Sequence, residues 1–257
     1  MGDGDPARAA KYARAAASVS HDGEGLYGAV FIAACIAAAF NEQNIESVIT
    51  QGLAQIPEDS LYARVTRAVL DFHTQNPDDW RACRIMLENE WGYDRYPGAC
   101  HIIPNAGVCV LSLIYGQGNF ARTIEIATMS GWDTDCNAGN VGTIAGVLAC
   151  IEGIPVHYRK PINDEIVLSS ASGYLNILDI PTYAWYLTMW AYRLRGEELP
   201  AEVLSHNTPG EIHFDFSLPG STHGIYTSDP CATRLQHKDV GPEGLWNRTI
   251  RGHRLNT

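Results

Sequence analysis

An uninterrupted apolar segment, Gly25 to Phe40, constrains the fold of this chain more than any other feature of its sequence. Its sixteen residues carry no charged side chain and are dominated by Ala and Gly. A membrane-spanning helix needs about 20 apolar residues, so this segment is too short to cross a bilayer. From Tyr27 to Phe40 it is apolar on every face, which is typical of a helix surrounded by other helices. We therefore expect a central helix inside a multi-layered, mainly α domain.

Composition narrows the classes of partner. The chain has 257 residues, 46% of them hydrophobic, which is enough for a substantial core. Its formal net charge is −11, and such a chain has no general attraction for phosphate backbones or anionic membranes. We expect neither a nucleic acid nor a membrane among its partners.

Cysteine usage indicates a reducing compartment. The seven cysteines include no Cys-x-x-Cys pair, and the first residues lack the basic and then apolar layout of a signal peptide. We expect reduced thiols and a cytoplasmic location.

Helix signals follow one another over residues 1–200, which we expect to form one helical domain. Asp78 and Asp79 are expected in the first turn of a helix, where the helix dipole favours negative charge. This structural interpretation is preferred to a metal-binding acidic pair. Beyond residue 200 the Glu211–Pro219 segment alternates apolar and polar residues, so 201–257 is predicted as a short β-prone extension, with too few strand signals to close a sandwich. The expected helices are Pro6–Ala17, Ile45–Gly52, Ser60–Gln75, one that residues 76–79 start and that carries Trp80 to Trp91 on its apolar side, Ala106–Tyr115, Phe120–Met129, Ala138–Ile151 and Pro181–Gly196.

The segment from Gly131 to Asn137 holds the clearest chemical motif, Gly-Trp-Asp-Thr-Asp-Cys-Asn. Its carboxylates, Asp133 and Asp135, are two positions apart in a predicted loop and can converge on one hard cation such as Mg²⁺. The alternative is structural: Asp133, Thr134 or Asp135 caps the helix that starts near residue 138.

With the residues that follow, this motif reads Gly-Trp-Asp-Thr-Asp-Cys-Asn-Ala-Gly-Asn-Val-Gly and resembles the signature of the ADP-ribosylglycohydrolase family, named for the dinitrogenase reductase-activating glycohydrolase. The resemblance covers roughly residues 6 to 160 and includes Ser20-His21 before the apolar helix. It implies an all-α bundle with two divalent ions, Mg²⁺ or Mn²⁺, that bind the ribose hydroxyls of ADP-ribose. The implied reaction hydrolyses the glycosidic bond to ADP-ribose on a protein side chain or a small leaving group.

The resemblance also implies roles for individual residues. Asp133 and Asp135 would be metal ligands, while His21, Trp132 and Thr134 would contact the substrate; no catalytic residue is assigned. His21 could instead satisfy free carbonyls at a helix end, and Trp132 could be a core aromatic. A soft thiol suits Mg²⁺ poorly, so Cys136 is left out of the ligand set and its role passes to a water or to Asn137.

Part of the family pattern is missing from the sequence. No Ser/Thr-Asp-Asp run occurs in the order that the family shows, so the resemblance implies that the N-terminal half of the helical domain is absent and that the metal set is incomplete. A homo-oligomer or a partner chain could supply the missing half. The alternative to an ADP-ribosylglycohydrolase is therefore a non-catalytic helical module that binds ADP-ribose or has a structural role.

Overall fold

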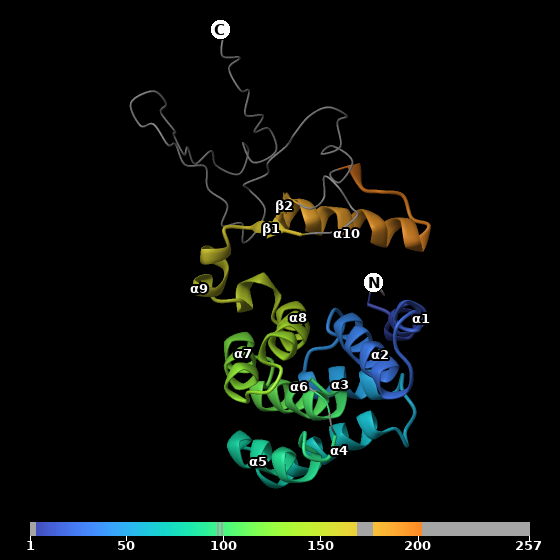
Figure 1. Cartoon of the computed structure of the whole chain (residues 1–257). Coiled ribbons are helices and arrows are strands. Elements are labelled where there is room, and N and C mark those ends of the chain that lie inside the picture. The colour runs from blue at the N-terminus through green and yellow to red at the C-terminus, as the bar shows by residue number, and fades with distance from the viewer. Residues whose placement is uncertain (1–3, 97, 99, 169–176, 202–257) are drawn as a thin grey trace. The chain divides into compact units, whose positions relative to one another are not determined.

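A computed structural model of the chain describes residues 4–96, 98, 100–168 and 177–201. They fall into two compact units that divide between Pro155 and Val156. In Figure 1 the first unit consists of helices, and the described part of the second combines helices with a small two-stranded sheet, which confirms the mainly α prediction.

The first unit is a layered bundle, and every helix predicted from the sequence in this region is present. Its helices are α1 (Pro6–Ala17), α2 (Gly23–Ala38), α3 (Ile45–Leu53), α4 (Leu61–Gln75), α5 (Trp80–Trp91), α6 (Ile102–Gly116), α7 (Phe120–Met129) and α8 (Thr134–Gly153).

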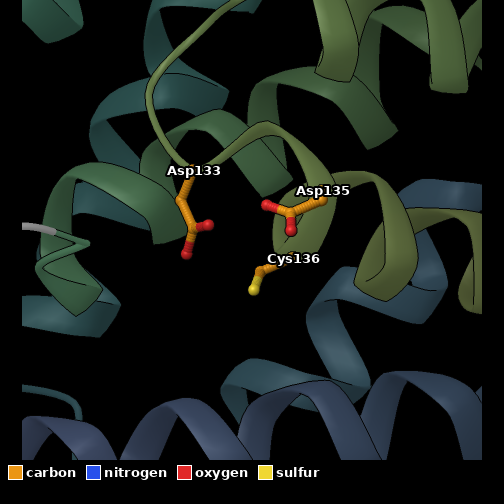
Figure 2. Close-up of side chains that lie close together, drawn as sticks. All are labelled: Asp133, Asp135 and Cys136. Atoms are coloured by element: carbon orange, nitrogen blue, oxygen red, sulfur yellow. The ribbon is translucent and has the colours of Figure 1, made fainter.

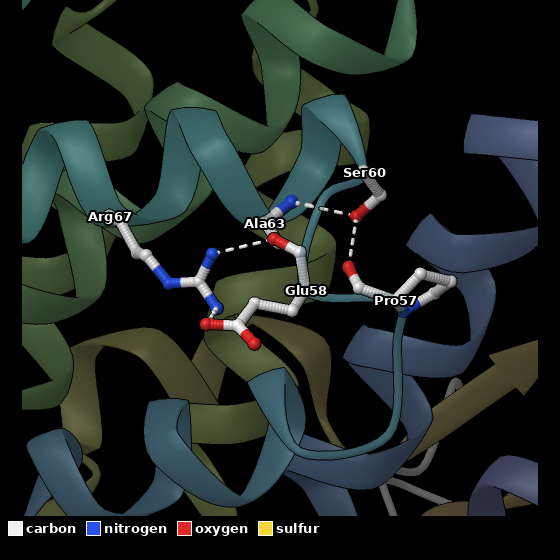
Figure 3. Close-up of polar contacts among 5 residues, drawn as sticks. All are labelled: Pro57, Glu58, Ser60, Ala63 and Arg67. Atoms are coloured by element: carbon white, nitrogen blue, oxygen red, sulfur yellow. Dashed lines mark hydrogen bonds and ion pairs between the residues drawn. The ribbon is translucent and has the colours of Figure 1, made fainter.

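Polar side chains at helix starts explain several of these boundaries. Ser60 accepts a hydrogen bond from the Ala63 amide (3.2 Å) and donates one to the Pro57 carbonyl (2.7 Å), which fixes the entry to α4 (Figure 3). Arg67, one turn further along, donates to the Glu58 carbonyl at 2.6 Å. Asp79 accepts from the Ala82 amide at 2.9 Å. Its role is structural, as expected, but it is the N-cap of α5 and lies just before the first turn rather than within it.

The helix buried on every face is α6 rather than α2. All residues of α6 from Ile103 to Gly116 are buried. By contrast, α2 packs against α1, α3, α4, α6 and α8, yet its residues Ile32 and Ile36 are only partly buried. Phe40, just after the end of α2, is 64% exposed. The prediction that α2 is surrounded by other helices on every face is therefore wrong, because one of its faces lines a pocket.

Helix α8 begins at Thr134, four residues before the predicted start, so the predicted loop is shorter. The Gly and Ala residues of α8 were expected to allow close packing. Gly142 does so, because a Cβ atom there would lie 2.9 Å from Ile124 Cδ1 in α7, whereas Gly139 faces open space.

The second unit contains α9 (Val156–Arg159), a 3₁₀ turn (Lys160–Ile162), β1 (Glu165–Val167), β2 (Ile177–Asp179) and α10 (Ile180–Arg195). The strands pair antiparallel with Ile166 opposite Leu178. Helix α10 confirms the predicted helix after residue 180; the strands, three residues each, were not predicted. Apart from residue 201, the predicted β-prone extension lies outside the described residues, and the domain boundary at 200 stays a prediction.

Two further expectations concern the part of the chain that the structure describes. None of its helices is, taken singly, both long and apolar enough to span a membrane. Its six cysteines are all free thiols.

Candidate functional site

The turn between α7 and α8 is held in place by a clamp from α5. Gly131 and Trp132 both have positive φ angles, 73° and 61°, a conformation that is costly for a bulky residue such as Trp. Arg84 donates from Nε to the Ser130 carbonyl at 2.7 Å, and its guanidinium lies 3.8 Å from the centroid of the Trp132 ring. The Tyr93 ring packs 5.0 Å from the same indole. These contacts stabilise the strained turn, and they fit the alternative of Trp132 as a core aromatic; its role in ligand stacking stays a prediction.

Asp133 occupies the N-cap position of α8 but does not cap it. Its backbone is non-helical (φ −86°, ψ 70°), and its side chain makes no cap hydrogen bond. Asp5, Ser60, Asp79 and Asn119, at the same position of other helices, all accept one. The carboxylate of Asp133 instead interacts with the thiols of Cys136 and Cys100.

Asp133, Asp135 and Cys136 form a cluster of three metal-ligating side chains. One ligand atom from each residue lies within 4.8 Å of the other two, and Figure 2 shows the two carboxylates and the sulfur grouped at the start of α8. The sequence motif predicted that the two carboxylates lie together. Cys136 was excluded from the predicted ligands because sulfur is a soft donor, although its position directly after Asp135 indicates that its thiol lies near the carboxylates.

The two carboxylates of the cluster place negative charge beside the neighbouring thiols. Hydrogen bonding to Asp133, together with the charges of Asp133 and Asp135, raises the pKa of the Cys136 thiol. Partial desolvation, followed by the charge of Asp133 and a hydrogen bond to it, raises the pKa of the exposed Cys100 thiol, on the loop before α6. The carboxylates thus keep both thiols protonated, and a bound cation would reverse this influence.

Two members of the cluster, Asp133 and Cys136, line a pocket of about 350 Å³, which is within the range of small-molecule sites. Asp135 is exposed and is not part of the lining. Small and aliphatic residues of α2 and α6 form one part of its wall, and polar residues at the start of α8 form another. No Lys, Arg or His occurs among the described residues that line it. They are Gly28, Ala29, Ile32, Ala33, Ile36, Tyr62, Cys100, Ile102, Asn105, Ala106, Cys109, Asp133, Cys136, Asn137 and Asn140.

A buried polar network fixes the first turn of α8 to α6. Asn137 is 2% exposed and donates to the Asn105 side chain at 2.9 Å, while the Cys109 thiol donates to its carbonyl oxygen at 3.5 Å. Asn105 in turn donates to the Tyr93 hydroxyl at 2.9 Å. Burial raises the pKa of Cys109 to about 12, so this thiol remains a donor. Because both ends of its amide are engaged, Asn137 positions the cluster and is a poor candidate for a metal ligand.

His21 and Thr134 lie outside the pocket lining. His21 is exposed just before α2; its Nδ1 lies 2.7 Å from the Ser20 hydroxyl oxygen, and its backbone N–H donates to the Ala17 carbonyl. Thr134 is the first residue of α8, and its hydroxyl lies 3.5 Å from the Trp132 carbonyl oxygen. The substrate-binding roles of both residues stay predictions.

Comparison with known proteins gives one match. The family model described as ADP-ribosylglycohydrolase matches residues 1–184, a range that contains the cluster, the pocket and the network. Searches of curated proteins and of solved structures found no match.

Proposed function

This chain belongs to the ADP-ribosylglycohydrolase family, and we propose that it hydrolyses the glycosidic bond of an ADP-ribosylated substrate. A divalent cation held by Asp133 and Asp135 assists the reaction. The observation that carries this proposal is the position of the acidic cluster at the edge of a pocket of ligand size. The substrate is a small molecule or a protein that carries ADP-ribose.

The charge of the pocket supports the need for a cation. ADP-ribose carries a negatively charged diphosphate, whereas the described lining contains Asp133 and no basic residue. Repulsion between the two would oppose binding, and a divalent cation between carboxylates and ligand oxygens removes it. Two carboxylates are also a common protein contribution to a divalent ion that keeps several waters, so the pair is suited to a divalent cation.

The remaining residues suggest how the ligand is oriented. The aliphatic wall from α2, with Ile32 and Ile36, is suited to the flat face of a base, while Asn140 on α8 offers an amide on the polar side. When bound, the cation supplies positive charge beside the ribose oxygens. In the net reaction a water oxygen bonds to the anomeric carbon, the bond to the leaving group breaks, and the leaving group takes up a proton. We assign no residue to the proton transfers.

The test is release of free ADP-ribose from ADP-ribosyl-arginine, ADP-ribosyl-serine and O-acetyl-ADP-ribose in the presence of a divalent cation. We expect Asp133→Asn combined with Asp135→Asn to lower the rate at least about 100-fold, because even outer-shell partners of a metal contribute about 10–100-fold. Glu125→Gln, an exposed carboxylate on α7, serves as the control and should leave the rate unchanged. An undiminished rate in the double variant would exclude the metal role of the two aspartates.

ADP-ribose binding without hydrolysis of any of these compounds would favour the non-catalytic module instead.

The free thiols of the described residues support a reducing compartment such as the cytoplasm for either function.

A further inference from the structure

The third donor of the cluster does not fit Mg²⁺, the cation that the resemblance implies. Mg²⁺ requires oxygen ligands in near-octahedral geometry, whereas Cys136 adds a sulfur within 4.8 Å of a ligand oxygen from each aspartate. Thiolate ligands favour softer cations, and Zn²⁺ accepts a mixture of Cys sulfur and Asp oxygen. The donor set therefore matches a thiophilic divalent ion better than a hard one.

We infer that this site selects Zn²⁺ or a similarly thiophilic divalent cation over Mg²⁺, with Cys136 as a direct ligand beside Asp133 and Asp135. The inference depends on the proposed function only for the location of the cation. Three protein ligands with a further position open to water or substrate is the usual arrangement of a zinc site that takes part in chemistry, whereas structural zinc sites have four protein ligands.

The surroundings of Cys136 allow this role without a rearrangement of the core. Its side chain is exposed and lies in the first turn of α8, directly before Asn137, which Asn105 and Cys109 hold in place. On the other side, Arg84 fixes the turn that carries Asp133. The donors thus come from a short segment anchored at both ends, which lowers the cost of ordering them around an ion.

Cys150 provides a matched control on the same helix. It is an exposed free thiol like Cys136, yet it neither lines the pocket nor belongs to the three-residue cluster. A general affinity of thiols for zinc would involve both cysteines, whereas the proposed site involves Cys136 alone.

The experiment uses the full chain, reduced and free of metal, and measures binding of Co²⁺ by its absorption spectrum and of Zn²⁺ by competition with a chromogenic chelator. Co²⁺ bound by a thiolate gives a sulfur-to-cobalt charge-transfer band. We expect the band in the unaltered chain and in Cys150→Ser, and its loss in Cys136→Ser. We also expect Cys136→Ser to weaken Zn²⁺ binding at least about tenfold while Mg²⁺ binding is kept or strengthened, since outer-shell changes alone cost about 10–100-fold.

Two results would overturn the inference: equal charge-transfer bands in Cys136→Ser and the unaltered chain, or Mg²⁺ that displaces Zn²⁺ at equal concentration. Hydrolysis is measured separately. Zinc binding that depends on Cys136, without release of ADP-ribose, would support the metal site and contradict the proposed function, whereas hydrolysis with Mg²⁺ and no sulfur-bound metal would do the reverse.

Discussion

At the scale of single residues, the site depends on a side chain that does not line the pocket. Trp132 has a left-handed backbone conformation, and the residue that compensates for it is Arg84, whose side chain is only 15% exposed. Burial lowers the pKa of its guanidinium, although the group remains charged at neutral pH. One arginine thus joins α5 to the turn that presents Asp133.

We predict that Arg84→Met destabilises the chain by about 2 kcal/mol, because it removes a charged hydrogen bond to the Ser130 carbonyl and the contact with Trp132. Cation binding at the cluster should weaken as well. Arg81→Met is the matched control, since Arg81 is an exposed residue of the same helix that lies over the Trp80 ring. Urea unfolding of both variants measures the difference, and equal stability losses would show that Arg84 has no special role.

At the scale of helices, most boundaries could be predicted from the sequence, because caps such as Ser60 and Asp79 act within a few residues of themselves. Two features could not. Asp133 has the residue type of a cap but makes no cap hydrogen bond, and the turn before it is contacted by Arg84, 49 positions earlier. The apolar patterns of α2 and α6 are alike, and only the tertiary arrangement decides that α6 is enclosed while α2 borders a pocket.

Two helical glycines make a test of this packing. A Cβ atom at Gly107 in α6 would lie 2.6 Å from Leu87 Cδ2, whereas one at Gly139 in α8 would meet nothing within 4 Å. We expect Gly107→Ala to destabilise the chain by about 1–3 kcal/mol through overpacking, and Gly139→Ala to stabilise it by about 0.5–1 kcal/mol through helix propensity. Thermal unfolding of the two variants gives the signs, and the same sign for both would contradict the packing described for α6 and α8.

At the scale of the whole molecule, the core holds reduced thiols that the mechanism does not use. Burial raises the pKa of Cys35, and it raises the pKa of Cys83 from 9.0 to about 12. Above pH 9 the unfolded chain releases these protons while the folded chain keeps them. Folding stability is therefore fully present below about pH 9 and is lost as the pH rises toward 12.

We predict that Cys83→Ala reduces this alkaline loss of stability. With one such thiol removed, the slope of unfolding free energy against pH between 9 and 12 should become less steep by up to about 1.4 kcal/mol per pH unit. Cys150→Ala, which removes an exposed thiol, should leave the slope unchanged. Urea unfolding across this pH range measures both variants, and identical slopes for Cys83→Ala and the unaltered chain would contradict the burial of Cys83.

The candidate site was only partly predictable at this scale. Asp133 and Asp135 follow from the sequence motif, because the two carboxylates are neighbours along the chain. Cys100 and Asn105 join the same pocket from a region about 30 positions away, and nothing local in the sequence indicates that contact. The expected role of His21 depended on the resemblance alone, and this residue does not line the pocket.

The central claim is that a cation held by Asp133 and Asp135 positions ADP-ribose in this pocket. Calorimetric titration of ADP-ribose, with and without a divalent cation, tests it most directly. We expect that ADP-ribose binding to the unaltered chain requires the cation. We also expect this binding to be lost in Asp133→Asn combined with Asp135→Asn. Binding that is equally tight without a cation, or unchanged in the double variant, would contradict it.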